Sequence, residues 1–283
     1  MSPLRNELAL VWLLRILALM AGALVLLIFA FLLNESLPIL GLVGLSAFFS
    51  DPSWHPMEGF FNLTSMLLGT LYATAGSVLL AAPLGILSAI FCRFYAPTHV
   101  ARIFRNLMES LSGVPSVVFG FWGLTVLVPL VNQIHPPGPS LFAGISILTM
   151  MILPTMAMAA DASFASVPQN YLRGAQALGL SKSATLLGVV LPAAKAGLLS
   201  GLILQSGRAI GETMALLMVC GNVVQTPKNI FDPIRTLTTN IALEMAYAMG
   251  SHRSALFVSG LILMLFIVVL LIAAEGINRV PKR

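Results

Sequence analysis

Long apolar segments alternate with shorter polar connections along the whole chain. Six of these segments are long enough to cross about 30 Å of hydrocarbon as α-helices. We place them at Leu10–Leu33, Leu63–Phe91, Met108–Val131, Leu141–Ala160, Gly197–Cys220 and Ala255–Ala274. The pattern therefore predicts an all-α membrane protein with six transmembrane helices.

Basic residues are distributed unevenly on the two sides of these spans. Most Lys and Arg follow spans two, four and six, whereas the loop after span one holds Glu35, Asp51 and Glu58 with neither. The positive-inside rule then predicts that both termini are cytoplasmic. We expect a first helix with a periplasmic segment at 1–62, a transmembrane domain at 63–278 that includes a cytoplasmic loop at 161–196, and a cytoplasmic tail at 279–283.

Composition supports a membrane protein and excludes a soluble domain. The chain is 58% hydrophobic and 9% charged, with a mean hydropathy of +0.96, whereas soluble domains carry about 25% charged residues. Loop asymmetry accounts for the net charge of +5, so it needs no nucleic-acid partner. Cys92 and Cys220 lie at opposite span ends and give no disulfide framework. The first span lacks a small-residue cleavage site, so we expect a membrane helix rather than a secretory signal.

Two charged residues, Arg208 and Glu212, lie within the fifth apolar segment. A charge near the bilayer centre costs roughly 2.5–3.5 kcal/mol on insertion scales, and residues four apart share one face of a helix. We favour the hypothesis that both line a substrate path, where Arg208 binds an oxyanion and Glu212 neutralises it when the path is empty. The alternative is a buried ion pair that fixes helix registry. The hydroxyls of Ser112, Ser116 and Thr213 are further candidate donors for the path.

Small residues and prolines mark points where membrane helices break or pack closely. The stretch Ser112-Gly113-Val114-Pro115-Ser116 predicts either a break that lines a polar cavity or an ordinary proline kink. In span five, the pairs Gly197/Gly201 and Gly207/Gly211 predict close approach of another helix.

The cytoplasmic loop at 161–196 contains helix signals. They predict a short helix over 171–178 that is capped by Gly179, then a second helix from Ser181 to Leu191-Pro192. Such an ordered segment is expected to dock on a partner. The alternative is a helix that lies on lipid headgroups, although Arg173, Lys182 and Lys195 provide little charge for that.

This loop resembles the cytoplasmic EAA loop of ABC importer permeases, E-A-A-x3-G-x9-I-x-L-P, which docks on the ATPase subunit. Gly179, the nine-residue gap and Leu191-Pro192 match, and Val189 stands where isoleucine is usual. The loop departs from the pattern at two positions: Arg173 replaces the glutamate and Gly174 the first alanine. The resemblance implies that the ATPase-docking residues are Arg173, Gly174, Ala175, Gly179, Leu191 and Pro192.

Two further stretches, 207–214 (GRAIGETM) and 114–120 (VPSVVFG), resemble PstC-type permease subunits of phosphate-specific ABC importers. The resemblance covers about residues 63–278. It implies a type I (MetI-like) ABC importer permease fold in a bacterial inner membrane, with the chain forming half of a phosphate path. The implied partners are a PstA-like second permease, a PstB-like ATPase dimer and a PstS-like periplasmic phosphate-binding protein. A permease for sulfate or molybdate is an alternative, although those permeases lack the Gly-Glu-Thr-Met ending.

The sequence lacks motifs for chemistry of its own. No G-x-x-x-x-G-K-[ST] loop occurs, so ATP and Mg are expected on the partner ATPase, and this chain is expected to hold no cofactor. No H-E-x-x-H or G-x-S-x-G motif indicates an enzyme, and the histidines have no metal-ligand spacing. Glu109 and Asp161 fall near span ends, where solvation is expected. An ATP-independent anion carrier or channel and an added signalling role remain alternatives.

Overall fold

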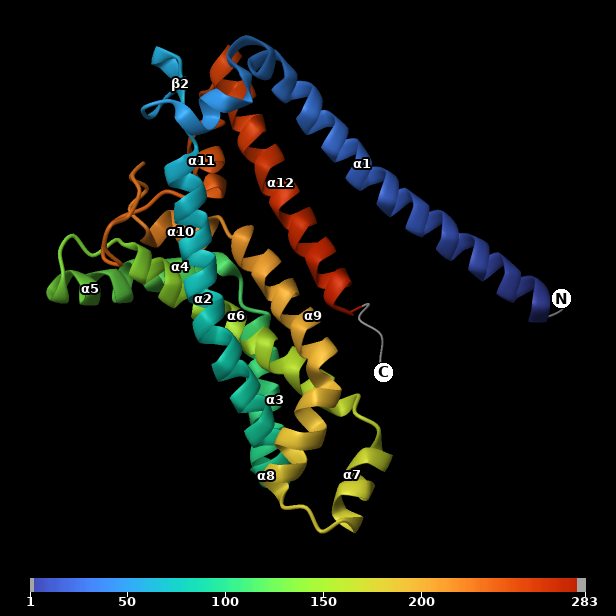
Figure 1. Cartoon of the computed structure of the whole chain (residues 1–283). Helices are drawn as coiled ribbons and strands as arrows, with labels where there is room; N and C mark the ends of the chain where they lie inside the picture. The colour runs from blue at the N-terminus through green and yellow to red at the C-terminus, as the bar shows by residue number, and fades with distance from the viewer. Residues whose placement is uncertain (1–2, 279–283) are drawn as a thin grey trace.

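The computed structural model describes residues 3–278, so the tail predicted at 279–283 lies outside the described residues. Helices account for most of the described residues (Figure 1). Up to residue 134 the elements are α1 (Pro3–Ser50), β1 (Trp54–His55), η1 (Pro56–Glu58), β2 (Phe60–Phe61), α2 (Thr64–Ile90), η2 (Phe91–Tyr95), α3 (Thr98–Ser112), α4 (Ser116–Trp122), η3 (Gly123–Leu127) and α5 (Val128–Ile134). From residue 141 they are α6 (Leu141–Ala165), α7 (Gln169–Ala177), α8 (Lys182–Thr185), η4 (Leu186–Val190), α9 (Leu191–Ile210), α10 (Met214–Val219), α11 (Leu237–Glu244) and α12 (Gly250–Asn278).

By length and composition, six described helical segments can cross a membrane, which confirms the predicted number of spans. The segments η2, η3 and η4 are π-helical turns that continue neighbouring α-helices. The candidate spans are Leu10–Ser50, Thr64–Tyr95, Ser116–Ile134, Leu141–Ala165, Lys182–Ile210 and Gly250–Ile272.

Helices α2 and α6 form the most extensive helix pair and carry the main core. Glycines on α2 allow the close approach. A Cβ on Gly76 would come within 2.5 Å of the Ile145 side chain, and one on Gly85 within 3.1 Å of the backbone nitrogen of Ala157. Such close packing makes the α2–α6 pair a rigid centre, because buried side chains interlock with few voids.

Helix α1 is longer than the sequence indicated. The expected span ended at Leu33 and residues 34–62 were expected to be a loop, but α1 continues through Pro38 to Ser50, with a non-helical backbone at Gly44 (φ 74°, ψ 165°). The reason is packing: Ile39 and Phe48 are fully buried in a second core shared with α12. Only residues 51–62 then remain for a short hairpin of β1 and β2.

Two other predicted spans were placed wrongly. The third begins at Ser116 rather than Met108, because the chain leaves the helix at Gly113–Pro115 and Pro115 disfavours a helical residue before it. The fifth covers Lys182–Ile210 rather than Gly197–Cys220. It begins within the predicted cytoplasmic loop because α8, η4 and α9 follow one another without a gap, and it ends where Gly211 caps α9 and a second short helix follows. The suspected break at 112–116 is therefore a true break between two helices and not a kink.

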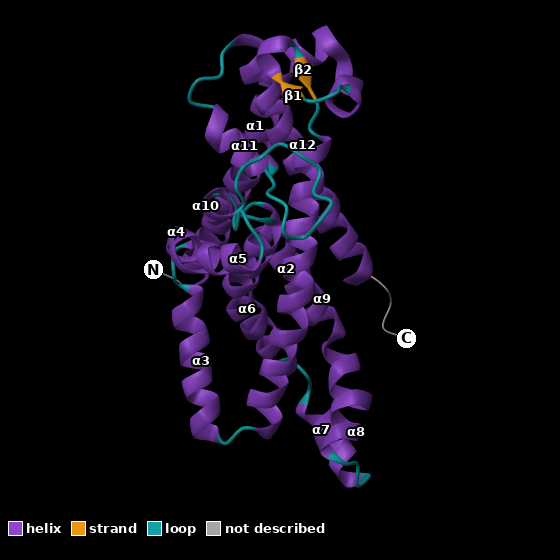
Figure 2. Cartoon of the chain, turned by 90° about the vertical axis from the view of Figure 1, so that its left-hand side faces the viewer, coloured by secondary structure: helices purple, strands orange, loops and turns teal. Residues whose placement is uncertain are grey.

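The two ends of the bundle have different structures. Figures 1 and 2 place α7 and α8 at one end and the β1–β2 hairpin with α11 at the other. Helices α4 and α5 lie at one height in both views, across the direction of α2. The short helix α10 lies at about that height too, so the broken spans meet between the two ends.

Candidate functional site

The centre of the candidate site is the point where span five breaks. Helix α9 ends at Ile210, Gly211 follows as its C-cap, and α10 begins at Met214. The amide of Gly211 donates to the carbonyl of Gly207 at 3.2 Å, which closes the last turn of α9. Broken backbone at membrane depth is tolerated where protein or a polar cavity satisfies it.

Arg208 lies in the last turn of α9, and its side chain is exposed on this chain. Among the side chains described over residues 10–272, no carboxylate lies within ion-pair distance of its guanidinium. The C-terminal end of a helix carries partial negative charge, which favours a cation there by about 0.3–1 kcal/mol at a surface. Arg208 is therefore held at a helix end with its donors available.

Glu212 does not pair with Arg208, so the expected ion pair is wrong for this structure. The helix stops between them, and Glu212 Oε1 instead accepts a hydrogen bond from the backbone amide of Ala215 at 3.0 Å. Its carbonyl accepts from Thr238 Oγ1 at 2.9 Å, which ties the break to α11. Glu212 therefore anchors the start of α10.

The candidate hydroxyls lie at the two breaks. Thr213 is the N-cap residue of α10 and donates its hydroxyl to the carbonyl of Gly211 at 3.2 Å. Ser112 ends α3 and donates to the carbonyl of Glu109 at 2.8 Å, whereas Ser116 begins α4. All three are half-buried.

Helices α4 and α10 pack directly on each other, which brings the two breaks into one region. Gly120 makes the contact possible, because a Cβ there would lie 2.9 Å from the Cα of Ala215 and 2.9 Å from Met218 Sδ. The structure therefore brings the segment that starts at Ser116 against the segment that follows Thr213.

The predicted helical segment in the 161–196 loop is present. Helix α7 follows Pro168, and Gly179 terminates it with φ +70°. The amide of Gly179 donates to the carbonyl of Gln176 at 3.0 Å, and the next amide donates to Ala175 at 3.1 Å, as at helix ends with a left-handed residue. Ser181 then caps α8, with its hydroxyl accepting from the amide of Ala184 at 3.2 Å.

The residues matched to the EAA loop are mainly on the surface of this segment. Arg173, Gly174 and Gly179 are exposed, as is Pro192 at the start of α9, whereas Leu191 is half-buried and Ala175 is buried. Large apolar side chains are exposed beside them: Tyr171 (55%), Leu178 (79%) and Leu180 (42%). Ala175 thus packs inward while its neighbours present an apolar surface.

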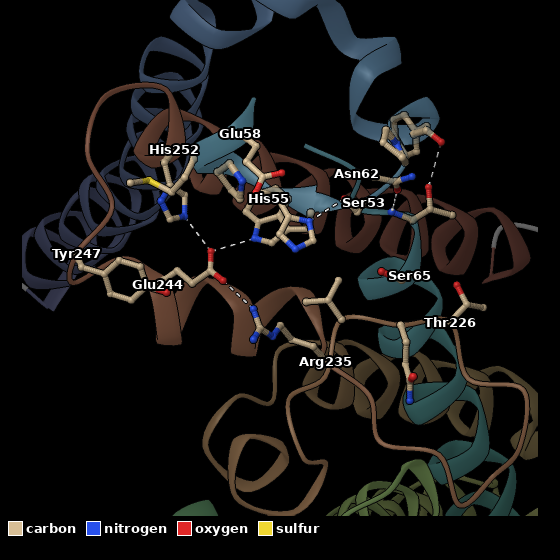
Figure 3. Close-up of a pocket in the computed structure, with 18 residues that line it drawn as sticks. Ser53, His55, Glu58, Asn62, Ser65, Thr226, Arg235, Glu244, Tyr247 and His252 are labelled. Atoms are coloured by element: carbon tan, nitrogen blue, oxygen red, sulfur yellow. Dashed lines mark hydrogen bonds and ion pairs between the residues drawn. The ribbon is translucent and has the colours of Figure 1, made fainter. Parts of the chain in front are cut away.

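An open cavity of about 690 Å³ lies at the opposite end of the bundle (Figure 3). Polar residues from the β1–β2 hairpin, the loop before α11 and the start of α12 line it. Tyr247 and Met57 at its lining are 63% and 91% exposed.

A buried ionic network supports this cavity and was missed by the sequence analysis. Glu244 Oε1 accepts from Arg235 at 2.7 Å, and Oε2 accepts from Trp54 Nε1 at 2.9 Å and lies 2.8 Å from His252 Nε2. Figure 3 shows Arg235 and His252 pointing towards the Glu244 carboxylate. Glu244 is the last residue of α11. Trp54 and Glu244 are 190 positions apart, so the sequence gave no signal for their contact.

A second ionic cluster lies towards the α7 end and corrects the expectation that Asp161 is simply solvated. Its carboxylate accepts from Arg93 Nε at 2.7 Å and from Arg105 Nε at 3.0 Å. One aspartate on α6 thus binds arginines from η2 and α3. The signal available in the sequence was one negative residue, Asp161, and two positive residues, Arg93 and Arg105, near the ends of predicted spans on the same side of the membrane.

Comparison with known proteins identifies the family. The model for binding-protein-dependent transport system inner membrane components matches residues 81–280. The chain belongs to this family. Membership confirms the expected multi-pass inner-membrane location, and it makes the chain a transport component rather than an enzyme.

Several curated relatives cover most of the chain. The probable ABC transporter permease protein YqgH of Bacillus subtilis (strain 168) is 38% identical over 251 residues, 86% of this chain and 79% of that protein. The phosphate transport system permease protein PstC of Mesorhizobium japonicum is 32% identical over 250 residues, 81% of this chain and 76% of that protein. PstC of Pasteurella multocida is also 32% identical, over 81% of this chain and 79% of that protein. The predicted resemblance to PstC-type permeases is confirmed.

Solved structures confirm the fold. A chain of a bacterial alginate ABC transporter, in complex with an alginate pentasaccharide-bound periplasmic protein, matches with a TM-score of 0.67 and 14% identity over 98% of each chain. A chain of the inward-facing MetNI methionine ABC transporter matches with a TM-score of 0.60 and 18% identity over 78% of this chain and 94% of that chain. The fold is that of an ABC importer permease.

Proposed function

We propose that this chain is the permease subunit of an ATP-driven inorganic phosphate importer and forms half of its translocation path. The observation that carries the proposal is the similarity to PstC permeases over about four-fifths of the chain. The site chemistry agrees with an oxyanion substrate, because a guanidinium stays charged and offers a planar fork of donors that suits phosphate.

In this proposal Arg208 binds phosphate at the break of span five, where its guanidinium has no carboxylate partner among the described residues. Glu212 positions α10 through the amide of Ala215 and repels an anion that approaches too closely. Ser112, Ser116 and Thr213 add hydroxyl donors from the two breaks. The exposed side of Arg208 faces a passage completed by a PstA-like second permease.

The α7 segment docks on a PstB-like ATPase dimer, which holds ATP and Mg. Tyr171, Leu178 and Leu180 supply the apolar part of the contact, with Arg173 beside them. Closure of the ATPase moves α7 and the ends of α6 and α9 that it joins. This end is then cytoplasmic, as are both termini.

The opposite end receives a PstS-like periplasmic phosphate-binding protein. The open cavity of about 690 Å³ and its exposed Met57 and Tyr247 form the contact surface. The network around Glu244 holds that surface in shape, because it joins the β1–β2 hairpin to α11 and α12.

Reconstitution tests the proposal. The chain is combined in proteoliposomes with a second permease, the ATPase and the binding protein from the same organism, and uptake of radiolabelled phosphate is measured with and without ATP. We expect ATP-dependent uptake that excess sulfate or molybdate does not inhibit. Uptake of sulfate or molybdate in place of phosphate would assign another oxyanion, and phosphate flux through this chain alone would make it a carrier.

A further inference from the structure

Helix α3 contacts α6 and has little fully buried surface. Of its residues Thr98–Ser112, only Ala101 is buried. The chain is extended before it, at Pro97 (ψ 148°), and leaves the helix after it at Gly113–Pro115. Figure 2 shows α3 at the edge of the bundle. A helix with a break at each end and one buried residue can move as a rod against α6.

Helix α3 packs on α6 through the half-buried Phe104 and Met108, and an ion pair adds a polar contact between the two helices. Arg105 on α3 donates through Nε to Asp161 Oδ2 at 3.0 Å, and its second nitrogen lies 3.5 Å from Oδ1. The Arg105 side chain is 45% exposed, so water weakens this pair and it can be broken. Arg93 binds the same carboxylate at 2.7 Å with a side chain only 26% exposed.

Arg105 has a second carboxylate available. Glu109 lies four residues on along α3, on the same face of the helix, and it lines the same cavity of about 190 Å³ as Arg105 and Asp161. The cavity leaves the guanidinium room to turn from α6 towards its own helix. Glu109 makes no ion pair with any side chain described over residues 10–272.

The position of Asp161 connects this exchange to transport. Asp161 lies in the last two turns of α6, and only Ser166–Pro168 separate α6 from the docking helix α7. At its other end, α3 leads through Gly113–Pro115 into α4, which packs on α10 beside the break that follows Arg208. Movement of α7 that is transmitted to the end of α6 therefore acts on the Arg105–Asp161 pair.

We propose that Arg105 is a latch that exchanges its partner between Asp161 on α6 and Glu109 on α3, and so couples the ATPase-docking segment to the substrate path. With Asp161 bound, α3 and α4 are held against the rigid α2–α6 pair. With Glu109 bound, α3 is free to carry α4 away from that position. Arg93 keeps α2 and α6 joined in both states. The inference rests on the proposed function, and Arg105 is a positioning residue that does not contact substrate.

The test uses the complete reconstituted transporter. ATP hydrolysis is measured with and without the binding protein, together with the number of phosphate ions transported per ATP. The variants are Arg105→Gln, which removes the latch, Arg105→Lys, which keeps its charge, and Glu109→Gln, which removes the alternative partner. Arg102→Gln is the matched control, because Arg102 is an exposed arginine on the same helix and forms no ion pair with any described residue.

We expect Arg105→Gln to raise hydrolysis without binding protein by about two- to fivefold, the range for one exposed ion pair, and to lower phosphate transported per ATP. Glu109→Gln should lower hydrolysis and leave that ratio unchanged. Arg105→Lys and Arg102→Gln should stay near wild type. Parallel loss of hydrolysis and transport in Arg105→Gln would overturn the latch. It would also be overturned if Arg105→Gln and Glu109→Gln changed the rate of ATP hydrolysis in the same direction. If the wild-type complex transports an anion other than phosphate, the proposed substrate fails while the hydrolysis rates still decide on the latch.

Discussion

Gly120 of α4 lies directly against Ala215 of α10, so that a Cβ on Gly120 would come 2.9 Å from the Ala215 Cα. This contact joins the two short helices that follow the breaks in spans three and five. Because the neighbouring atom belongs to the backbone, it cannot move aside as a flexible side chain would. The distance between the two breaks is therefore set by the absence of a side chain at residue 120.

Gly120→Ala should destabilise the protein. Forcing a methyl group into a packed interior costs about 1–3 kcal/mol, which should lower the thermal unfolding midpoint in detergent. Gly22→Ala on α1 is the control, because a Cβ there meets nothing within 4 Å. Equal midpoints for both variants would mean that α4 and α10 are not in close contact.

Removal of the Glu244 charge should also destabilise the fold. Glu244→Gln leaves the half-buried Arg235 without its carboxylate, and breaking such a pair costs up to about 3 kcal/mol when some water still reaches it. Glu58→Gln, at an exposed position lining the same cavity, should leave the unfolding midpoint unchanged. If the two variants unfold at the same temperature, the network does not hold the cavity together.

Gly179 offers a test of the docking segment. Its φ of +70° suits glycine and is tolerated by asparagine, whereas a β-branched residue is strained there. We expect Gly179→Val to lower co-purification of the ATPase several-fold, and Gly179→Asn to retain most of it. Retention of the ATPase by Gly179→Val would show that the α7 turn is not needed for docking.

The loop before α11 should lose stability in acid. Backbone hydrogen bonds from Asn229 and Lys228 hold the pKa of Asp232 below its ordinary range. A lowered pKa means that the carboxylate contributes stability above its unfolded pKa, and that this contribution is lost as the pH falls through the folded pKa. The difference in unfolding midpoint between wild type and Asp232→Asn should therefore be present at neutral pH and vanish in acid. A difference that persists in acid would contradict this role.

The sequence predicted features whose signals are local. Apolar length located spans two, four and six to within a few residues, and Pro168, Gly179 and Ser181 located α7 and α8 because helix caps depend on neighbouring residues. The sequence did not predict features that depend on packing between distant residues. Apolar length ended the first span at Leu33, yet burial of Ile39 and Phe48 lets α1 continue to Ser50 across the non-helical Gly44.

In the candidate site, too, the sequence predicted local features but not contacts that depend on the fold. Arg208 was singled out by its charge within an apolar stretch, and it lies at a helix break as an exposed cation. The assumption of one continuous helix produced the wrong partner for Glu212, because hydropathy continues across Gly211 while the backbone does not. The pairs of Asp161 with Arg93 and of Glu244 with Trp54 join residues 68 and 190 positions apart, and spacing alone cannot predict them.

The role of Arg208 in the path can be measured directly by labelling. In the reconstituted transporter, Arg208→Cys is treated with a cationic thiol reagent, and the labelling rate and phosphate uptake are followed with and without phosphate. The account predicts that Arg208→Cys abolishes uptake, that phosphate but not sulfate slows labelling, and that the added ammonium group restores part of the transport. Labelling that is blocked in every state, or that phosphate does not change, would contradict a path through Arg208.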